Sequence, residues 1–253
     1  MSMVQNRYPL ISKDKLTEDI YSFWIDCPDL VSGAVPGQFV HVRLPGFLLR
    51  RPISICEMAK GRLRLVFQIR GAGTEQMAAM EPGSMVDLLG PLGRGFGLTA
   101  PGDRAVLVGG GIGTPPMLPL AQHYDGAAVF LGFRDADSIM LREDFRQADA
   151  ILTLTTDDGS AGIPGFVTGP LERYLKSEGA DILFACGPMG LLKNVQALAL
   201  KYNIPAQLSL EERMACGVGA CLGCAVPIRT AAGEVYRHVC KDGPVFKAEE
   251  VVF

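Results

Sequence analysis

The sequence predicts a fold in three parts: an antiparallel β-barrel, a parallel α/β sheet and a small cysteine-rich segment at the C-terminus. Short β-rich runs, with glycine or proline between them, extend to about Pro101. Compact apolar strands then alternate with segments of helical spacing, and from Ser209 the chain is rich in cysteine and glycine. A chain of 253 residues is long enough for two compact domains and a small third. The predicted domains are residues 1–101, 102–208 and 209–253.

The barrel is predicted from strands in which apolar residues alternate with polar ones. Three runs have this period of two, and they cover residues 38–44, 63–69 and 85–89. Turn residues separate them at the spacing typical of small antiparallel barrels.

The second part is predicted from short apolar runs with longer segments between them. The expected strands are residues 105–108, 127–131, 151–155 and 182–185, and residues 190–202 have the spacing of a helix. Strands that alternate with helices predict a parallel sheet.

Composition argues against several kinds of partner. The formal net charge is -3, from 24 basic and 27 acidic residues without a long run of either sign, so no nucleic-acid-binding surface is expected. Residues 105–124 carry no formal charge but contain four glycines and three prolines, which predicts a strand, a loop and a helix start and no membrane span. The N-terminus lacks the pattern of a secretory signal, so we expect a cytoplasmic protein whose seven cysteines do not form a disulfide framework.

Four of the cysteines have a spacing that indicates an iron–sulfur cluster. Cys216, Cys221, Cys224 and Cys240 form C-x4-C-x2-C-x15-C, which matches the plant-type [2Fe-2S] pattern. The small residues between them would let a tight loop turn its N–H groups toward the sulfurs. Structural zinc and plain buried thiols are the alternatives, although zinc ribbons usually have a second C-x2-C pair. Cys27, Cys56 and Cys186 lie outside the pattern and are expected in the core.

Two motifs of the predicted barrel could bind phosphate. Arg51-Pro-Ile-Ser54 follows one strand-like run, and Gly71-Ala-Gly-Thr74 follows another and leads into a helix-like segment. The free N–H groups at that helix start and the charge of Arg51 would suit a pyrophosphate. The alternatives are an exposed charge at a strand edge and a turn that caps a helix.

Two further motifs end predicted parallel strands. Gly109-Gly-Gly-Ile-Gly113 precedes a proline-rich helix start, and Cys186-Gly-Pro-Met189 follows the strand over residues 182–185. Such loops can present backbone donors to a nucleotide phosphate, but glycine also permits close packing of strand and helix, and Cys186-Gly-Pro can be a simple turn. Asp135 and Asp137 follow the loop by roughly 20 residues, where a carboxylate can bind a ribose, whereas Arg134 beside them would suit a 2′-phosphate.

Taken in this order, the motifs resemble those of the ferredoxin reductase-like flavoproteins. The segments 209–224 and 239–246 are more narrowly similar to the electron-transfer subunits of class B, NAD-dependent dihydroorotate dehydrogenases. The resemblance covers essentially the whole chain.

The resemblance implies three sites. The FAD site would comprise Arg51, Pro52, Ile53, Ser54, Gln68, Ile69, Arg70, Gly73 and Thr74, with Ser54 near the isoalloxazine and Arg51 near the pyrophosphate. The NAD site would comprise Gly109, Gly110, Gly111, Gly113, Cys186, Gly187 and Pro188. The cluster ligands would be Cys216, Cys221, Cys224 and Cys240.

The resemblance also implies a function and a partner. Electrons would pass from the FMN of a dihydroorotate-oxidising catalytic subunit through [2Fe-2S] and FAD to NAD+, in a heterotetramer with two chains of each kind. Met214, Val218 and Leu222 are candidate contacts with that subunit, or else local core. The alternatives are a reductase for a ferredoxin, hydrogenase or oxygenase, and a zinc-binding interaction module.

Overall fold

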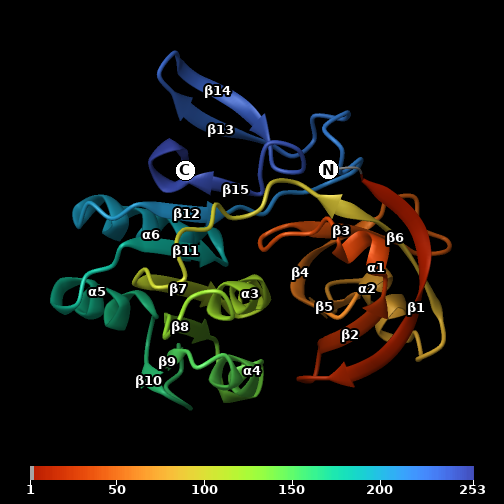
Figure 1. Cartoon of the computed structure of the whole chain (residues 1–253), viewed down its shortest axis with the longest axis horizontal. Coiled ribbons are helices and arrows are strands. Elements are labelled where there is room, and N and C mark those ends of the chain that lie inside the picture. Colours follow the sequence, from red (N-terminus) through yellow and green to blue (C-terminus); the bar gives the residue numbers. More distant parts are fainter. Residues whose placement is uncertain (1–2) are drawn as a thin grey trace. The chain divides into compact units, whose positions relative to one another are not determined.

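The computed structural model describes residues 3–253, and its contacts divide the chain into two compact units. The first unit contains the described residues up to Phe96 together with Glu211–Val226 and Arg237–Pro244. The second contains Gly97–Leu210, Pro227–Tyr236 and Val245–Phe253. Figure 1 shows a barrel drawn in red to yellow and a layered α/β part drawn in green to blue.

The first unit is built on a closed antiparallel barrel with the strand order β1-β2-β5-β4-β3-β6. Its strands are β1 (Val4–Lys15), β2 (Ile20–Asp26), β3 (Phe39–Arg43), β4 (Arg51–Ala59), β5 (Arg62–Gln68) and β6 (Met85–Leu92). Two short helices, α1 (Pro28–Val31) and α2 (Ala72–Ala78), lie in its connections. The predicted antiparallel barrel is therefore confirmed.

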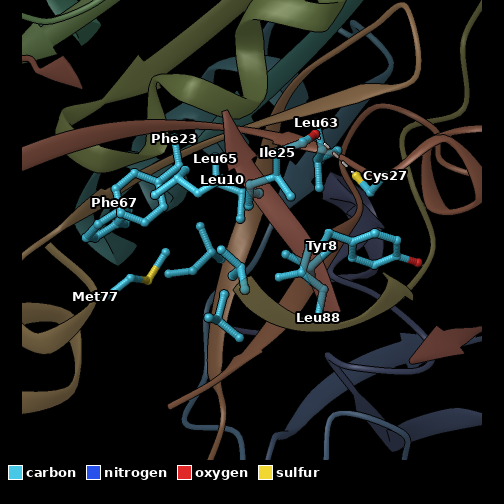
Figure 2. Close-up of a cluster of buried hydrophobic side chains, with 14 of the residues drawn as sticks. Tyr8, Leu10, Phe23, Ile25, Cys27, Leu63, Leu65, Phe67, Met77 and Leu88 are labelled. Atoms are coloured by element: carbon cyan, nitrogen blue, oxygen red, sulfur yellow. Dashed lines mark hydrogen bonds between the residues drawn. The ribbon is translucent and has the colours of Figure 1, made fainter. Parts of the chain in front are cut away.

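The alternating apolar residues of these strands fill the barrel with large side chains (Figure 2). Phe23 and Phe67 meet edge to face with ring centroids 5.0 Å apart, and both are fully buried. Met77 of α2 joins the same core. Each such side chain contributes about 1.5–3 kcal/mol when it is withdrawn from water, so the barrel has its own source of stability.

The second unit is a sheet of seven strands in the order β10-β9-β8-β7-β11-β12-β15. Its strands are β7 (Ala105–Gly110), β8 (Ala128–Phe133), β9 (Ile151–Thr156), β10 (Ile163–Pro164), β11 (Ile182–Cys186), β12 (Ala206–Ser209) and β15 (Val245–Lys247). Its α-helices are α3 (Leu118–Ala121), α4 (Arg142–Gln147), α5 (Thr168–Ser177) and α6 (Met189–Lys201). Short 3-10 helices are η1 (Gly111–Gly113), η2 (Pro115–Met117), η3 (Ala136–Ser138) and η4 (Ala248–Glu250).

All neighbouring strands of this sheet run parallel except β12 and β15, so the predicted parallel sheet is confirmed. The helices α3 and α4 lie on one side of the sheet and α5 and α6 on the other (Figure 1). The chain runs outward from β7 through β8 to β9 and then returns to place β11 on the other side of β7. Loops that leave the carboxyl ends of strands at such a reversal are where open α/β sheets bind ligands.

The cysteine-rich end of the chain contributes to both units. The strands β13 (Ala225–Thr230) and β14 (Gly233–His238) form a two-stranded sheet, and β15 extends the large sheet. The division into domains at residues 101 and 208 stays a prediction, because compactness alone does not test which segments fold or act independently. Within residues 3–253 no helix has the length and apolar character needed to cross a bilayer.

Candidate cofactor sites

A cavity of about 580 Å³ opens on the barrel where two of the predicted motifs meet. Of the predicted flavin residues, the motif residues Arg51, Pro52, Gly73 and Thr74 line it together with Arg70. The remaining lining residues are Gly46, Phe47, Leu48, Leu49, Arg50, Gly71, Ala72 and Met214. Motifs about twenty residues apart in the sequence thus face one space of the size typical of ligand sites.

Arg51 contacts an aromatic ring and a glycine. Its guanidinium carbon lies 4.3 Å from the centroid of the Phe47 ring, which is a cation–π contact. A β-carbon at position 73 would overlap the guanidinium, so any larger residue there would have to displace Arg51. The guanidinium also donates to the carbonyl of Leu49. The Arg51 guanidinium therefore places a positive charge at the cavity, beside the residues of α2 that line it.

Thr74 shapes the cavity wall, whereas the other four predicted flavin residues lie outside the lining. The Thr74 hydroxyl accepts hydrogen bonds from the N–H groups of Arg70 (2.8 Å) and Gly71 (3.2 Å) and closes the loop before α2. Gln68 donates to Asp19 at 2.6 Å. The side chain of Ile53 belongs to the barrel core. Ser54 of β4 and Ile69 are half-buried and do not line this cavity.

Several residues of the cavity wall were not predicted from the sequence. Phe47, Leu48 and Leu49 stand directly before Arg50 and the Arg51 motif, and Leu48 is fully exposed at 103%. Three apolar residues in a turn, where polar ones are usual, were the signal that could have identified them. Met214 comes from the segment before the cysteine loop, and no local pattern connects it with the barrel motifs.

The two nucleotide-loop motifs lie side by side in the second unit. The strands β7 and β11 are parallel neighbours, with Gly109 in register with Cys186. A β-carbon at position 113 would lie 2.5 Å from the carbonyl oxygen of Cys186, and one at position 110 would lie 2.9 Å from Cδ of Pro188. Both glycines are therefore needed for close packing of the two loops, in agreement with the packing alternative for these positions.

Gly111 differs from its neighbours in this loop. Its φ is +50°, and a β-carbon there would meet nothing within 4 Å, so the glycine serves backbone conformation and leaves open space.

Asp135 follows β8 and accepts hydrogen bonds from the backbone of Ser138 (2.9 Å) and from Arg134 (2.7 Å). Hydrogen bonds from Ser138, followed by those from Arg134, lower the pKa of Asp135. Two of the three candidate specificity residues, Arg134 and Asp135, are thus engaged with each other, and the structure favours neither nucleotide.

The cysteine loop turns several N–H groups onto sulfur atoms. The sulfur of Cys216 accepts from the backbone of Val218 (3.4 Å), Ala220 (3.2 Å) and Cys221 (3.4 Å). The sulfur of Cys240 accepts from Gly219 at 3.1 Å, and that of Cys224 accepts from the backbone of Cys240 at 3.4 Å. Donors at the sulfurs are the feature that iron–sulfur loops use to offset the negative charge of the cluster.

These contacts affect the thiols unequally. Burial by itself would raise the pKa of Cys216, but the N–H groups of Val218, Cys221 and Ala220, with the Cys221 side chain, outweigh it and lower the pKa to about 6. Burial, followed by the neighbouring Cys224, raises the pKa of Cys240 to about 12. Cys221 thus interacts with Cys216, and both Cys224 and Cys216 interact with Cys240. Among the described residues no set of three or more potential ligands converges on a single point, as one metal ion would require.

The cysteine segments are attached to the barrel end within the same unit. The backbone N–H of Arg94 donates to the carbonyl of Gly243 at 2.5 Å, and Arg94 forms a parallel bridge with Pro244. A β-carbon at Gly93 would lie 2.6 Å from the same carbonyl oxygen. Val218 and Leu222 are 41% and 63% exposed, so the alternative that they are local core does not hold for them.

A second cavity is lined by none of the predicted site residues. It has a volume of about 360 Å³ and is lined by Ile139, Arg142, Arg146, Leu152, Thr153, Leu154, Ala161, Gly162 and Ile163. None of the sequence motifs contributes to it.

Comparison with known proteins connects these sites with a family. Residues 211–252 match the model of the iron-sulfur cluster binding domain of dihydroorotate dehydrogenase B. The chain is 41% identical over 242 residues to the dihydroorotate dehydrogenase B (NAD(+)) electron transfer subunit of Desulforamulus reducens, with 92% of each chain covered. It is 39% identical to the corresponding subunit of Shouchella clausii with all of both chains covered.

Solved structures agree with the fold. The chain is 30% identical to a chain of an NADH-dependent reduced ferredoxin-NADP oxidoreductase, with a TM-score of 0.86 over 98% of this chain and 90% of that one. It matches the cytochrome b5 reductase domain of nitrate reductase from Ulva prolifera at 19% identity with a TM-score of 0.65, over 79% of this chain and 94% of that one, which shows a shared fold.

A ferredoxin reductase-like fold with an iron–sulfur domain at its C-terminus defines an electron-transfer component of an oxidoreductase. The identity over nearly the full length narrows this class: the chain belongs to the family of dihydroorotate dehydrogenase B (NAD(+)) electron transfer subunits. The predicted function and the predicted cofactors, an iron–sulfur cluster, FAD and NAD, are confirmed at the level of this family. An electron transfer subunit also implies a catalytic partner subunit.

Proposed function

We propose that Cys216, Cys221, Cys224 and Cys240 hold a [2Fe-2S] cluster in this chain. The supporting observation is the loop itself, whose backbone donors face the sulfurs of Cys216 and Cys240. The lowered pKa of Cys216 means that one thiolate is already formed near neutral pH, and thiolates are the species that bind iron.

The spacing of the cysteines and the donors at their sulfurs also support the cluster over zinc. A single zinc ion needs its four sulfurs at about 2.3 Å from one point, whereas two bridged irons take two thiolates each. The fourth cysteine stands alone in the sequence, and N–H groups of the loop are directed at the sulfurs of Cys216 and Cys240, as suits a negatively charged cluster. The residues present therefore fit the cluster.

We further propose that the barrel cavity binds FAD. Arg51, which contacts Phe47 and Gly73, would neutralise the pyrophosphate, and the N–H groups at the start of α2 would stand beside it. Phe47 and Leu48 offer apolar surface for a ring system at the open side. Pro52, Ile53 and Ser54 of β4, with Gln68 and Ile69, would shape the rest of the site.

The loops after β7 and β11 are proposed to bind NAD. Gly109, Gly110 and Gly113 pack against Cys186, Gly187 and Pro188, and Gly111 leaves open space at the carboxyl ends of the strands. Backbone donors at this edge of a parallel sheet suit a nucleotide phosphate. The choice of NAD over NADP follows the names of the relatives.

The catalytic partner is proposed to be an FMN-containing subunit that oxidises dihydroorotate to orotate in pyrimidine biosynthesis, in a cytoplasmic heterotetramer of two chains of each kind. When bound, the [2Fe-2S] cluster would supply one-electron transfer and FAD the conversion to the hydride that NAD+ accepts. The residues of this chain would hold these groups, donate to the sulfurs and balance the phosphate charge.

The exposed side chains on the cysteine loop support a partner surface there. Leu222 is 63% exposed, and its φ of +60° is a conformation that costs a leucine about 1–3 kcal/mol. Burial within this chain does not explain an exposed apolar side chain in a strained backbone beside Cys221. We therefore propose that Val218 and Leu222 contact the catalytic subunit.

The experiment that tests this function is purification of the chain with its native partner, followed by an assay of dihydroorotate-dependent NAD+ reduction. We expect the complex to reduce NAD+, and we expect Cys224→Ser to abolish that activity. The matched control is Cys27→Ala, which changes a fully buried cysteine outside the pattern and should keep the activity. A complex that oxidises dihydroorotate but never reduces NAD+ would contradict the proposal.

A second candidate function is a reductase that serves a ferredoxin. It is favoured by the similarity to the NADH-dependent reduced ferredoxin-NADP oxidoreductase at 30% identity. In that case the purified complex would reduce a ferredoxin with NADH and would show no activity with dihydroorotate.

A further inference from the structure

His41 is a fully buried polar residue of β3 whose two ring nitrogens have no hydrogen-bond partner among residues 3–253. Its backbone oxygen accepts from Arg50 at 3.3 Å, but the imidazole itself is unsatisfied. A buried donor or acceptor that has exchanged water for no partner destabilises a protein, and most native proteins contain few of them. The ring is therefore expected to have a partner that is not part of the polypeptide.

The imidazole is neutral near physiological pH. Burial, followed by the positive charge of Arg50, lowers the pKa of His41 to about 4. A neutral imidazole has one N–H donor and one acceptor nitrogen, so the ring can donate a single hydrogen bond without bringing a charge.

The ring edge that carries both nitrogens faces the cysteine loop. A β-carbon at Gly217 would lie 2.5 Å from Cε1 of His41 and 2.8 Å from each ring nitrogen. Cε1 stands between the two nitrogens, so the whole N–C–N edge is turned toward this glycine. Gly217 follows Cys216 directly and has a φ of +71°, so glycine is required here both by the backbone and by the ring.

The residue that pairs with His41 on the neighbouring strand β4 belongs to the proposed flavin site. On the barrel sheet His41 is in register with Pro52 of β4, one residue after Arg51. The backbone of His41 is thus part of the strand pair that carries the flavin motif, while its side chain edge is directed at the cluster loop. This orientation favours the cluster over the flavin as the missing partner.

We propose that His41 is a positioning residue of the iron–sulfur centre, and that its imidazole N–H donates a hydrogen bond to a sulfur of the cluster or of its cysteine ligands. This inference rests on the proposed function, because it requires a cluster at Cys216 and its neighbours. Hydrogen bonds to the sulfurs stabilise the more negative, reduced state, so His41 would raise the reduction potential of the cluster. It would also fix the cluster loop on the strand pair that carries Arg51.

The most direct test is the magnetic coupling between the imidazole nitrogen and the reduced cluster. The full chain in complex with its partner is produced with ¹⁵N only in the histidine rings, reduced, and measured by pulsed electron paramagnetic resonance. We expect a weak ¹⁵N coupling from the wild-type protein, and we expect His41→Leu to remove it. His123→Leu is the matched control, since that ring contacts the carbonyl of Thr99 at 3.1 Å in the other unit.

The second readout is the reduction potential. Loss of one hydrogen bond to the cluster is expected to change the equilibrium for reduction about tenfold, which lowers the potential by about 59 mV for a one-electron couple. His41→Gln retains a donor and is expected to recover at least half of this shift. His123→Leu should leave the potential unchanged.

The outcomes separate this inference from the proposed function. A cluster signal without any imidazole coupling, or a coupling that is the same in His41→Leu as in wild type, overturns the role of His41 and leaves the cluster assignment intact. An unchanged potential in a His41→Leu protein that retains its cluster overturns it as well. A chain without iron and sulfide would overturn the proposed function and this inference with it.

Discussion

The guanidinium of Arg51 packs directly on Gly73, and a β-carbon at position 73 would lie 2.5 Å from Cζ of the arginine. Residues from two separate motifs therefore depend on each other for their positions. The position of this proposed phosphate-binding cation depends on the absence of a side chain at Gly73 of α2 as much as on the Arg51-Pro-Ile-Ser54 motif itself.

Gly73→Ala is expected to displace Arg51 and weaken FAD binding. The affinity should fall about tenfold to a hundredfold, because a hydrogen bond to a charged group is worth about 1.5–3 kcal/mol. Fluorescence titration of the flavin-free protein measures this directly. Gly33→Ala is the control, since a β-carbon there meets nothing within 4 Å. Equal FAD affinities of both variants would argue against the role of Arg51.

Gly113→Ala is expected to separate the two nucleotide loops. The added carbon would lie 2.6 Å from Cα of Gly187, so one loop must move. Misplacement of a binding loop by about an ångström can cost a factor of about ten to a hundred, and NAD+ affinity should fall by that amount. The flavin spectrum and iron content should not change. Gly102→Ala, where nothing lies within 4 Å, is the control. Unchanged NAD+ affinity in Gly113→Ala would place the nucleotide elsewhere.

Asp181 makes the stability of the second unit depend on pH. The carboxylate accepts from the side chain of Arg104 at 2.8 Å and from its backbone at 2.9 Å, and these hydrogen bonds lower the pKa of Asp181. A carboxyl whose pKa is lowered in the folded state stabilises it above the pKa of the unfolded chain, and this contribution is lost as pH falls through the folded value.

We therefore expect Asp181→Asn to lower the Tm at pH 7 by about 1–3 °C, as is typical of an exposed ion pair. The difference from wild type should shrink in acid and vanish once the carboxyl is protonated. Calorimetry across this range, with Asp14→Asn of β1 as the control, measures it. A difference that is constant with pH would show that charge is not its cause.

Leu222→Asp is expected to weaken assembly with the catalytic subunit while the iron content stays constant. Loss of a hot-spot contact typically costs about 2 kcal/mol or more, so the dissociation constant should rise at least about thirtyfold. Met85→Asp, which alters another exposed apolar residue of the first unit (53% exposed), is the control. If Leu222→Asp assembles as tightly as Met85→Asp, the contact surface lies elsewhere.

Much of the architecture could be predicted because the signals are local. The period of two over residues 63–69 corresponds to β5, and the apolar run at residues 105–108 corresponds to the first part of β7. The cysteine spacing pointed to the iron–sulfur domain that the family model matches over residues 211–252. Such patterns reflect backbone periodicity and ligand geometry, which do not depend on distant residues.

The remaining features depend on contacts between distant segments. The residues Met214 and Arg51 are far apart in the sequence but line one cavity. The edge strand β15 joins β12 in antiparallel pairing, and nothing in its three residues indicates a partner. In the sequence His41 is only a polar residue in a strand of alternating pattern. The position of Gly217 in the structure shows that the edge of the His41 ring faces the cysteine loop.

The cluster is tested most directly by iron, zinc and acid-labile sulfide analysis of the chain after purification without oxygen. For a [2Fe-2S] centre we expect about two irons and two sulfides per chain, and we expect Cys216→Ser to lose them while Cys27→Ala retains them. A chain with one zinc and no labile sulfide would contradict the assignment of these four cysteines.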